Sequence, residues 1–131
     1  MNKEIFKSER YFTIWDYQVS HGQLLLRSDK RKGHEKNIDI IFFDSTYIQL
    51  FAMLYGVSIR KLNKNENIKY NSVKEYLNYD NSYLFEIESG KEQYYIAASF
   101  VRVFENELGF NETSLGVLQF QGREKEIGGS L

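Results

Sequence analysis

Cysteine and proline are both absent from this chain of 131 residues. Without cysteine there is no disulfide framework, no thiolate metal site and no thiol nucleophile, which fits a cytoplasmic protein. Without proline, no turn is fixed by a locked φ angle and no connection is a proline-rich linker. No apolar run has the length of a signal peptide or approaches the ~20 residues of a membrane span. We therefore expect a soluble, unexported protein of the cytoplasm with no membrane partner.

Few residues in the sequence could form a metal site or a nucleic-acid-binding site. The only two histidines, His21 and His34, do not have a ligand spacing such as i, i+4 on a helix, so no metal or cofactor is expected. A formal net charge of -1 creates no field that attracts nucleic acid. The basic run 29–37 is either a solvated hairpin loop or a phosphate-binding finger. Because no aromatic residue lies within it and Asp29 and Glu35 offset its charge, we predict a loop and no nucleic-acid site.

Aromatic residues are abundant instead, with 10 Tyr and 10 Phe. Residues 38–50 place β-branched and aromatic residues on both sides of Asp44-Ser45, which predicts a hairpin with its turn there. In the first arm, residues 38–43, only Asp39 is polar, so this arm is predicted to be a central strand covered on both faces. Burial could raise the pKa of Asp39 or Asp44, although aspartate beside a turn commonly accepts bonds from backbone N–H groups.

Further strands are predicted from alternation or from short apolar runs bounded by turn residues. They cover residues 11–19, 23–28, 57–62, 82–88, 93–104 and 115–120. A change of apolar phase predicts a bulge near Ser99, and Glu86 is predicted to face water. The capping-box spacing from Ser72 predicts one or two helical turns. The expected fold is therefore mostly β, an antiparallel β-sandwich or flattened barrel with one short helix over residues 1–121, followed by a flexible tail over residues 122–131.

Candidate functional residues fall into two groups. Asp16 and His21 flank the first turn, and a carboxylate and an imidazole placed there could form a pair that shuttles a proton. A solvent-facing aspartate and a turn histidine are the simpler explanation, so we predict that the protein is not an enzyme. Several tyrosines lie in or beside the expected helix, where at most one face can be buried. Because tyrosine gives a rigid contact at low entropy cost, these are the predicted binding residues: Tyr70, Tyr76 and Tyr79.

Four segments resemble small bacterial proteins, some of which are described as immunity proteins that accompany secreted toxins. They are Trp15–His21, Leu24–Ser28, Asn37–Ile40 and Tyr47–Leu50. The resemblance covers about Trp15 to Gly56 and brings no catalytic residues with it. It implies a small β-rich protein that binds another protein.

The sequence supports two main functions of different classes. One is binding through protein–protein contact, either to a partner such as a toxin blocked by occlusion or to further copies of the chain. The other is a module that holds an apolar or aromatic small molecule between its sheets. A strongly apolar pocket would favour the ligand-binding module, and a flat tyrosine-rich patch with acidic neighbours would favour the protein-binding one. An enzyme that uses Asp16 and His21, or a purely structural role, remains as a further alternative.

Overall fold

The computed structural model describes residues 3–63 and 82–131. These residues form one nine-stranded antiparallel sheet in the order β4-β7-β6-β5-β1-β2-β3-β8-β9, which confirms the predicted fold class. The predicted helix after Ser72 lies outside the described residues. The strands are β1 (Lys3–Gln18), β2 (Gln23–Ser28), β3 (Asn37–Phe43), β4 (Tyr47–Gln49), β5 (Met53–Lys61), β6 (Tyr83–Ser89), β7 (Glu92–Ala98), β8 (Phe100–Asn106) and β9 (Lys125–Gly129). Two 3-10 turns, η1 (Ser20–Gly22) and η2 (Lys30–Lys32), separate β1 from β2 and β2 from β3.

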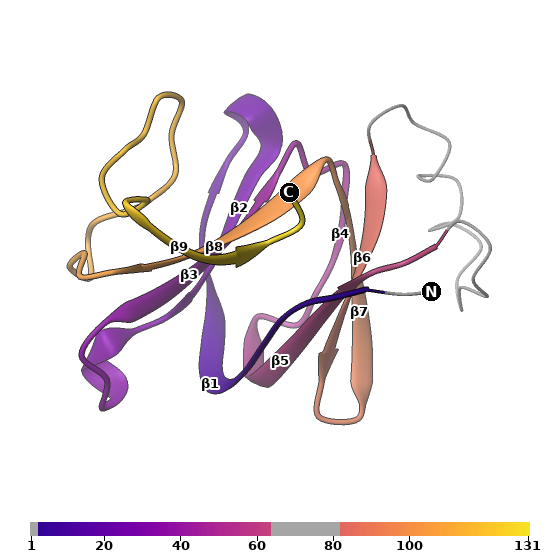
Figure 1. The fold of residues 1–131 in the computed structure, drawn as a ribbon, viewed down its shortest axis with the longest axis horizontal. Coiled ribbons are helices and arrows are strands. Elements are labelled where there is room, and N and C mark those ends of the chain that lie inside the picture. The colour runs from indigo at the N-terminus through magenta and orange to yellow at the C-terminus, as the bar shows by residue number, and fades with distance from the viewer. Residues whose placement is uncertain (1–2, 64–81) are drawn as a thin grey trace.

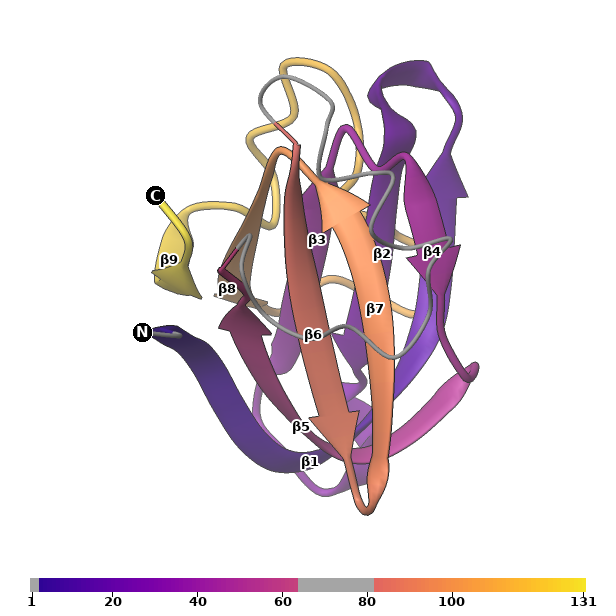
Figure 2. The same cartoon turned by 90° about the vertical axis from the view of Figure 1, so that its right-hand side faces the viewer.

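β1 joins the two parts of the sheet. Residues 3–13 of β1 pair with β5, and residues 13–18 pair with β2. Its register shifts twice opposite β5 and once opposite β2, and such bulges bend a strand. The sheet therefore folds over on itself, with β4 to β7 on one side and β2, β3, β8 and β9 on the other (Figure 1). Figure 2 shows β6 and β7 in front of β2 and β3 as two layers.

The main core lies between these two layers. Fifteen buried hydrophobic residues form it, and they come from seven different strands. Phe42 of β3 meets Phe85 of β6 edge to face, with 5.8 Å between the ring centroids. Every residue of β3 is buried, so the prediction of a central strand covered on both faces at residues 38–43 is confirmed. Truncating a side chain in such a core lowers the free energy of unfolding by several kcal/mol, because the surrounding side chains cannot fully close the cavity that is left.

The hairpin predicted for residues 38–50 is wrong. β3 pairs with β2 and β8, whereas β4 pairs with β7 at the opposite edge of the sheet. Asp44 has a φ of 53° and its N–H donates to the carbonyl of His21 at 2.9 Å, while the N–H of Ser45 donates to the carbonyl of Gly22 at 3.0 Å. These bonds to η1 direct the chain away from β3, and it crosses to the other layer before β4 begins.

The long strand predicted for residues 93–104 is divided in two. β7 ends at Ala98 and β8 begins at Phe100, and they belong to opposite ends of the sheet order. Ser99 lies between them, and its N–H donates to the carbonyl of Phe43 at 2.9 Å. The change of apolar phase therefore marks a crossing between layers, and the predicted bulge near Ser99 is wrong.

Three further predictions are corrected. Residues 115–120 form no strand; the last strand is β9, which lies inside the segment predicted as a flexible tail and pairs with β8. The apolar run at 115–120 fails to extend because Gly116 and Leu118 have φ angles of 144° and 58°. Glu86, predicted to face water, is only 6% exposed and accepts a hydrogen bond from Nε of Arg60 at 2.8 Å.

Candidate functional site

The connection from β8 to β9, residues 107–124, lies against the outer face of β2, β3 and β8; we call it loop 107–124. Its Leu115 is 2% exposed and packs in a second buried cluster with Leu25, Ile41 and Phe104. Loop 107–124 is therefore fixed on the sheet by a small core of its own, and polar contacts reinforce it.

A buried ion pair provides the first polar anchor. Arg27 of β2 and Asp39 of β3 are direct cross-strand neighbours and are 1% and 0% exposed. Nε of Arg27 donates to Oδ1 of Asp39 at 2.7 Å, and Nη2 donates to Oδ2 at 2.9 Å. The remaining nitrogen, Nη1, donates to the carbonyl of Glu112 at 2.9 Å. The charge pair is thus bidentate, and its spare donor holds the backbone of loop 107–124.

Asp39 and its neighbours hold both arms of the loop. Oδ2 of Asp39 also accepts from Oγ of Ser114 at 2.7 Å and from Nδ2 of Asn106 at 2.9 Å. Nδ2 of Asn106 donates in addition to the carbonyl of Gly122 at 3.1 Å, and Asn37 donates to the carbonyl of Leu108 at 2.9 Å. Buried polar groups need such partners, and here the partners are the start and the end of the same loop.

A second anchor lies at the first residue of β2, Gln23. Oε1 of Gln23 accepts from the N–H of Gly116 at 3.0 Å and from Nη2 of Arg123 at 3.0 Å. Nε of Arg123 donates to the carbonyl of Ser114 at 2.7 Å, and its guanidinium lies 5.2 Å from the centre of the Phe43 ring. Burial and the charge of Arg102 lower the pKa of Arg123 below its ordinary value. Arg123 therefore ties the end of the loop to Ser114 in its middle and to Gln23 of β2.

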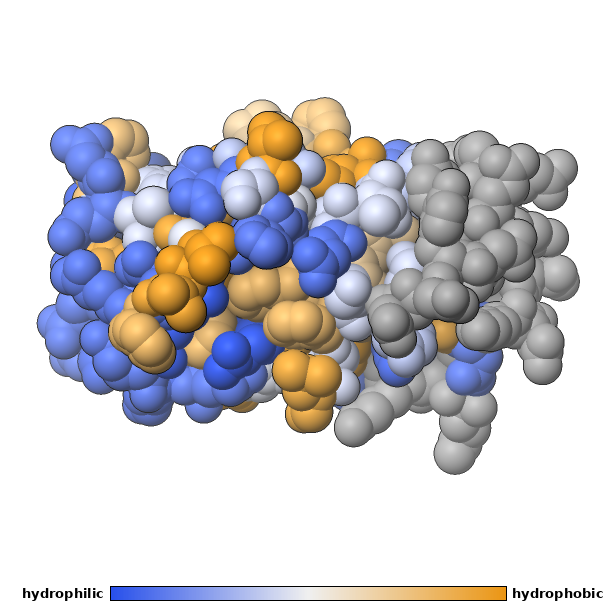
Figure 3. Space-filling view, turned by 90° about the horizontal axis from the view of Figure 1, so that it is seen from above, coloured by the Kyte–Doolittle hydropathy of each residue, from blue (hydrophilic) through white to orange (hydrophobic). Residues whose placement is uncertain are grey.

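Beyond these anchors the loop exposes large apolar side chains. Val117, Leu118 and Phe120 are 58%, 85% and 78% exposed; we call these three residues the apolar tip. Leu118 also adopts a positive φ, a conformation that leucine seldom takes. Seen from above, the molecule carries separate groups of hydrophobic side chains among hydrophilic ones (Figure 3). A fixed backbone that presents apolar side chains to solvent is typical of a binding surface.

Phe110 of the same loop has a different role. Although it is 57% exposed, its ring meets Trp15 edge to face at 5.2 Å, and the guanidinium of Arg31 lies 4.3 Å from its centre. Nζ of Lys30 donates to the carbonyl of Glu107 at 2.6 Å. The basic run 29–37 thus fastens the start of loop 107–124, which gives its cations a structural role.

Asp29 shapes this basic run. Its Oδ1 accepts from the N–H of Arg31 at 3.1 Å and caps η2, and its Oδ2 accepts from Nε of the same arginine at 2.8 Å. The side-chain hydrogen bond from Arg31 lowers the pKa of Asp29 below its ordinary value. The acidic residue at the start of the run therefore neutralises one of its cations directly.

The residues predicted for function are placed as follows. Asp16 and His21 share no hydrogen bond or ion pair: Asp16 accepts from the N–H of Tyr17, and His21 contributes its backbone carbonyl to Asp44. Over residues 3–63 and 82–131, no group of acidic or histidine side chains could hold a metal ion. In the same part of the chain, no helix is long and apolar enough to cross a membrane. The predicted binding residues lie outside the described residues: Tyr70, Tyr76 and Tyr79.

Sequence reasoning missed the loop and its buried anchor. Arg27 and Asp39 each stand alone as a charge within an apolar strand, and a lone charge at such a position predicts a buried partner. Their opposite signs were the available indication of a pair.

Comparison of the chain with protein-family models, with curated proteins and with solved structures finds no match.

Proposed function

We propose that this chain is a binding protein whose apolar tip inserts into a protein partner. The observation that carries the proposal is the exposure of Val117, Leu118 and Phe120 on a loop whose backbone is fixed by a buried ion pair. A loop fixed before binding loses little conformational entropy when it binds, so more of its contact energy appears as affinity.

The apolar tip alone provides too little binding free energy for a stable complex, so a second contact is needed. Burying a valine, leucine or phenylalanine side chain contributes about 1.5–3 kcal/mol each, so three of them contribute roughly 5–9 kcal/mol. Association costs ~4–15 kcal/mol in lost motion, which consumes much of that gain. The predicted tyrosine contacts are the natural supplement: Tyr70, Tyr76 and Tyr79.

The interior of the molecule favours this function over the small-molecule alternative. The space between the two layers, where an apolar ligand would have to lie, is filled by side chains such as Phe42, Phe85 and Ile96, each with no exposed surface. A ligand there would have to displace packed core side chains, at a cost of several kcal/mol.

Site-specific photo-crosslinking in the native host cell tests the proposal. A benzophenone amino acid placed at Leu118 should give a single discrete adduct, while the same group at Tyr55, which is 76% exposed on β5, should not give it. With the purified partner, Leu118→Asp should weaken binding at least tenfold, whereas Tyr55→Ala should leave it unchanged. Equal adducts at both positions, or an unchanged affinity for Leu118→Asp, would contradict the proposal.

The partner that the resemblance implies is a secreted toxin held inactive by occlusion. If the crosslinked partner is an enzyme, one equivalent of this chain should inhibit it, and Leu118→Asp should restore its activity. Inhibition that persists with Leu118→Asp would mean that the toxin is blocked through another surface.

A further inference from the structure

A second candidate site lies where β1 bends on the other side of the molecule. Ser8 pairs with Val57 and Tyr11 pairs with Tyr55, so Glu9 and Arg10 together face the single residue Gly56. Gly56 has a φ of 84°, and a Cβ added there would lie 3.6 Å from the carbonyl oxygen of Ser8. Gly56 therefore contributes backbone alone at the point where β1 carries its extra residue.

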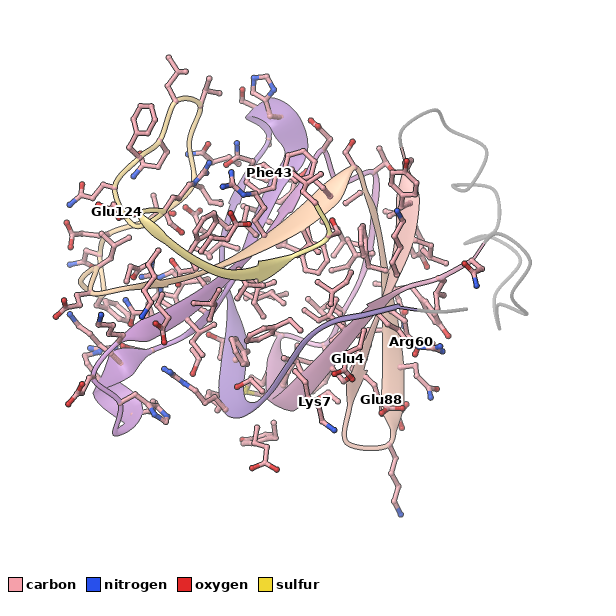
Figure 4. All side chains as sticks on the ribbon, in the orientation of Figure 1. Glu4, Lys7, Phe43, Arg60, Glu88 and Glu124 are labelled. Carbon is pink, nitrogen blue, oxygen red and sulfur yellow. The ribbon has the colours of Figure 1, made fainter. Side chains whose placement is uncertain are left out.

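A shallow hollow of about 340 Å³ occupies this point. Lys7, Ser58 and Glu88 are successive cross-strand neighbours on β1, β5 and β6, and with Glu9 they form its polar rim. Lys7 and Glu88 lie close together near Glu4 in Figure 4. Cavities that hold small molecules begin at about 300 Å³, so this hollow has room for one or two sugar-sized rings.

The Tyr55 side chain lines the hollow, and Tyr11 lies against it. The rings of Tyr11 and Tyr55 lie 4.8 Å apart between centroids and are tilted by 43°. Tyr55 lines the hollow and keeps 76% of its surface exposed, so it is open to a ligand. An aromatic ring has a negative face that attracts the weakly positive hydrogens of a C–H bond.

We propose that this hollow binds a neutral carbohydrate. One face of a sugar ring presents C–H groups, which would lie on the Tyr55 ring, while the hydroxyl groups at its edge would bond the rim. Charged side chains make the strongest hydrogen bonds to hydroxyls, and Glu9, Glu88 and Lys7 supply both acceptors and a donor. An apolar ligand would make no hydrogen bond to these groups.

The charge and the hydrogen-bonding groups of the rim distinguish a neutral sugar from two charged alternatives. Glu9 and Glu88 outnumber Lys7, so an anionic sugar such as a uronic acid would meet net repulsion. A quaternary ammonium ligand would be attracted by this excess of negative charge and by the Tyr55 face, but its head group offers no hydrogen-bond donor or acceptor to the rim, so choline is the competing ligand in the test. A neutral sugar satisfies donor and acceptor together.

Nuclear magnetic resonance titration of the full chain with glucose, galactose, mannose, N-acetylglucosamine and their β-linked disaccharides tests this proposal. At least one sugar should shift the Tyr11 and Tyr55 ring resonances saturably, with a Kd on the order of 1 mM. Tyr55→Ala should weaken that binding at least tenfold and Tyr55→Phe less than twofold. Phe120→Ala, which removes an equally exposed ring from the apolar tip, should have no effect.

Three outcomes would overturn the proposal. They are the absence of saturable shifts up to about 20 mM of every sugar, binding that survives Tyr55→Ala in a folded variant, and saturable binding of choline in place of sugars. The carbohydrate site and the apolar tip are tested separately, because Leu118→Asp should not change sugar binding and Tyr55→Ala should not change the crosslink at Leu118.

Discussion

Replacing Asp39 with alanine should lower the free energy of unfolding by ~3–5 kcal/mol. The Asp39 carboxylate accepts two hydrogen bonds from Arg27, one from Asn106 and one from Ser114. Its removal leaves the Arg27 guanidinium, which is 1% exposed, without a counter-charge in the interior. Because a domain is stable by only about 5–15 kcal/mol, this single change removes a large part of the total.

Urea denaturation followed by tryptophan fluorescence measures the effect directly. Trp15 is the only tryptophan of the chain, and Cζ of Arg27 lies 5.1 Å from the centre of its ring, so the emission reports on this site. The double variant Arg27→Met/Asp39→Leu should be more stable than Asp39→Ala, since it leaves no unpaired charge. Glu126→Ala, which breaks the half-exposed pair with Arg102, should cost less than about 1 kcal/mol. A loss for Asp39→Ala as small as that control would refute the reasoning.

Three further outcomes are expected. Phe42→Ala should destabilise the fold by ~3–5 kcal/mol in denaturant melts, because its ring is fully buried between the layers; a loss below about 1 kcal/mol would contradict this. The folded-state pKa of Asp29 lies below its ordinary value of 3.8, so its bond with Arg31 stabilises the fold above that value and the stabilisation is lost as the pH falls through the lower, folded pKa. In urea melts at a series of pH values, the wild type should therefore be more stable than Asp29→Asn at neutral pH, and the two stabilities should converge in acid. A stability difference that does not change with pH would contradict this. Duplex or single-stranded nucleic acid should not bind with a Kd below about 1 μM at physiological salt. Tighter binding that is lost when Lys30, Arg31 and Lys32 are replaced would contradict this prediction.

The strands themselves could be predicted because their evidence is local. Alternation identified most of β6, and a short apolar run bounded by turn residues identified β2 with the bounds that the structure has. Strand pairing is different, since it depends on contacts between distant segments. The hairpin at residues 38–50 was predicted from neighbouring strands of the right composition, but backbone bonds from Asp44 and Ser45 to η1 decide where the chain goes next.

The candidate site could be predicted only in part. Residues 115–120 have the composition of a strand, and nothing local shows that Leu118 has a positive φ or that Leu115 alone is buried. The backbone of loop 107–124 is held in place, with its apolar tip exposed, by bonds to residues such as Arg27 and Gln23, which lie far away in the sequence. The sugar-sized hollow likewise depends on a register shift opposite Gly56, which no single segment reveals.

The position of β3 has a consequence for synthesis on the ribosome. β1, β2 and β3 follow one another in the chain and can pair as soon as they emerge, but β3 receives its second neighbour only when β8, which begins at Phe100, has been made. Until then the nascent chain carries an apolar strand, Asn37–Phe43, with an open hydrogen-bonding edge, which is a template for aggregation. Pairings between such distant segments also form slowly, typically in milliseconds to seconds. We therefore expect the yield of folded protein to depend on translation speed and on chaperones more than its final stability would suggest.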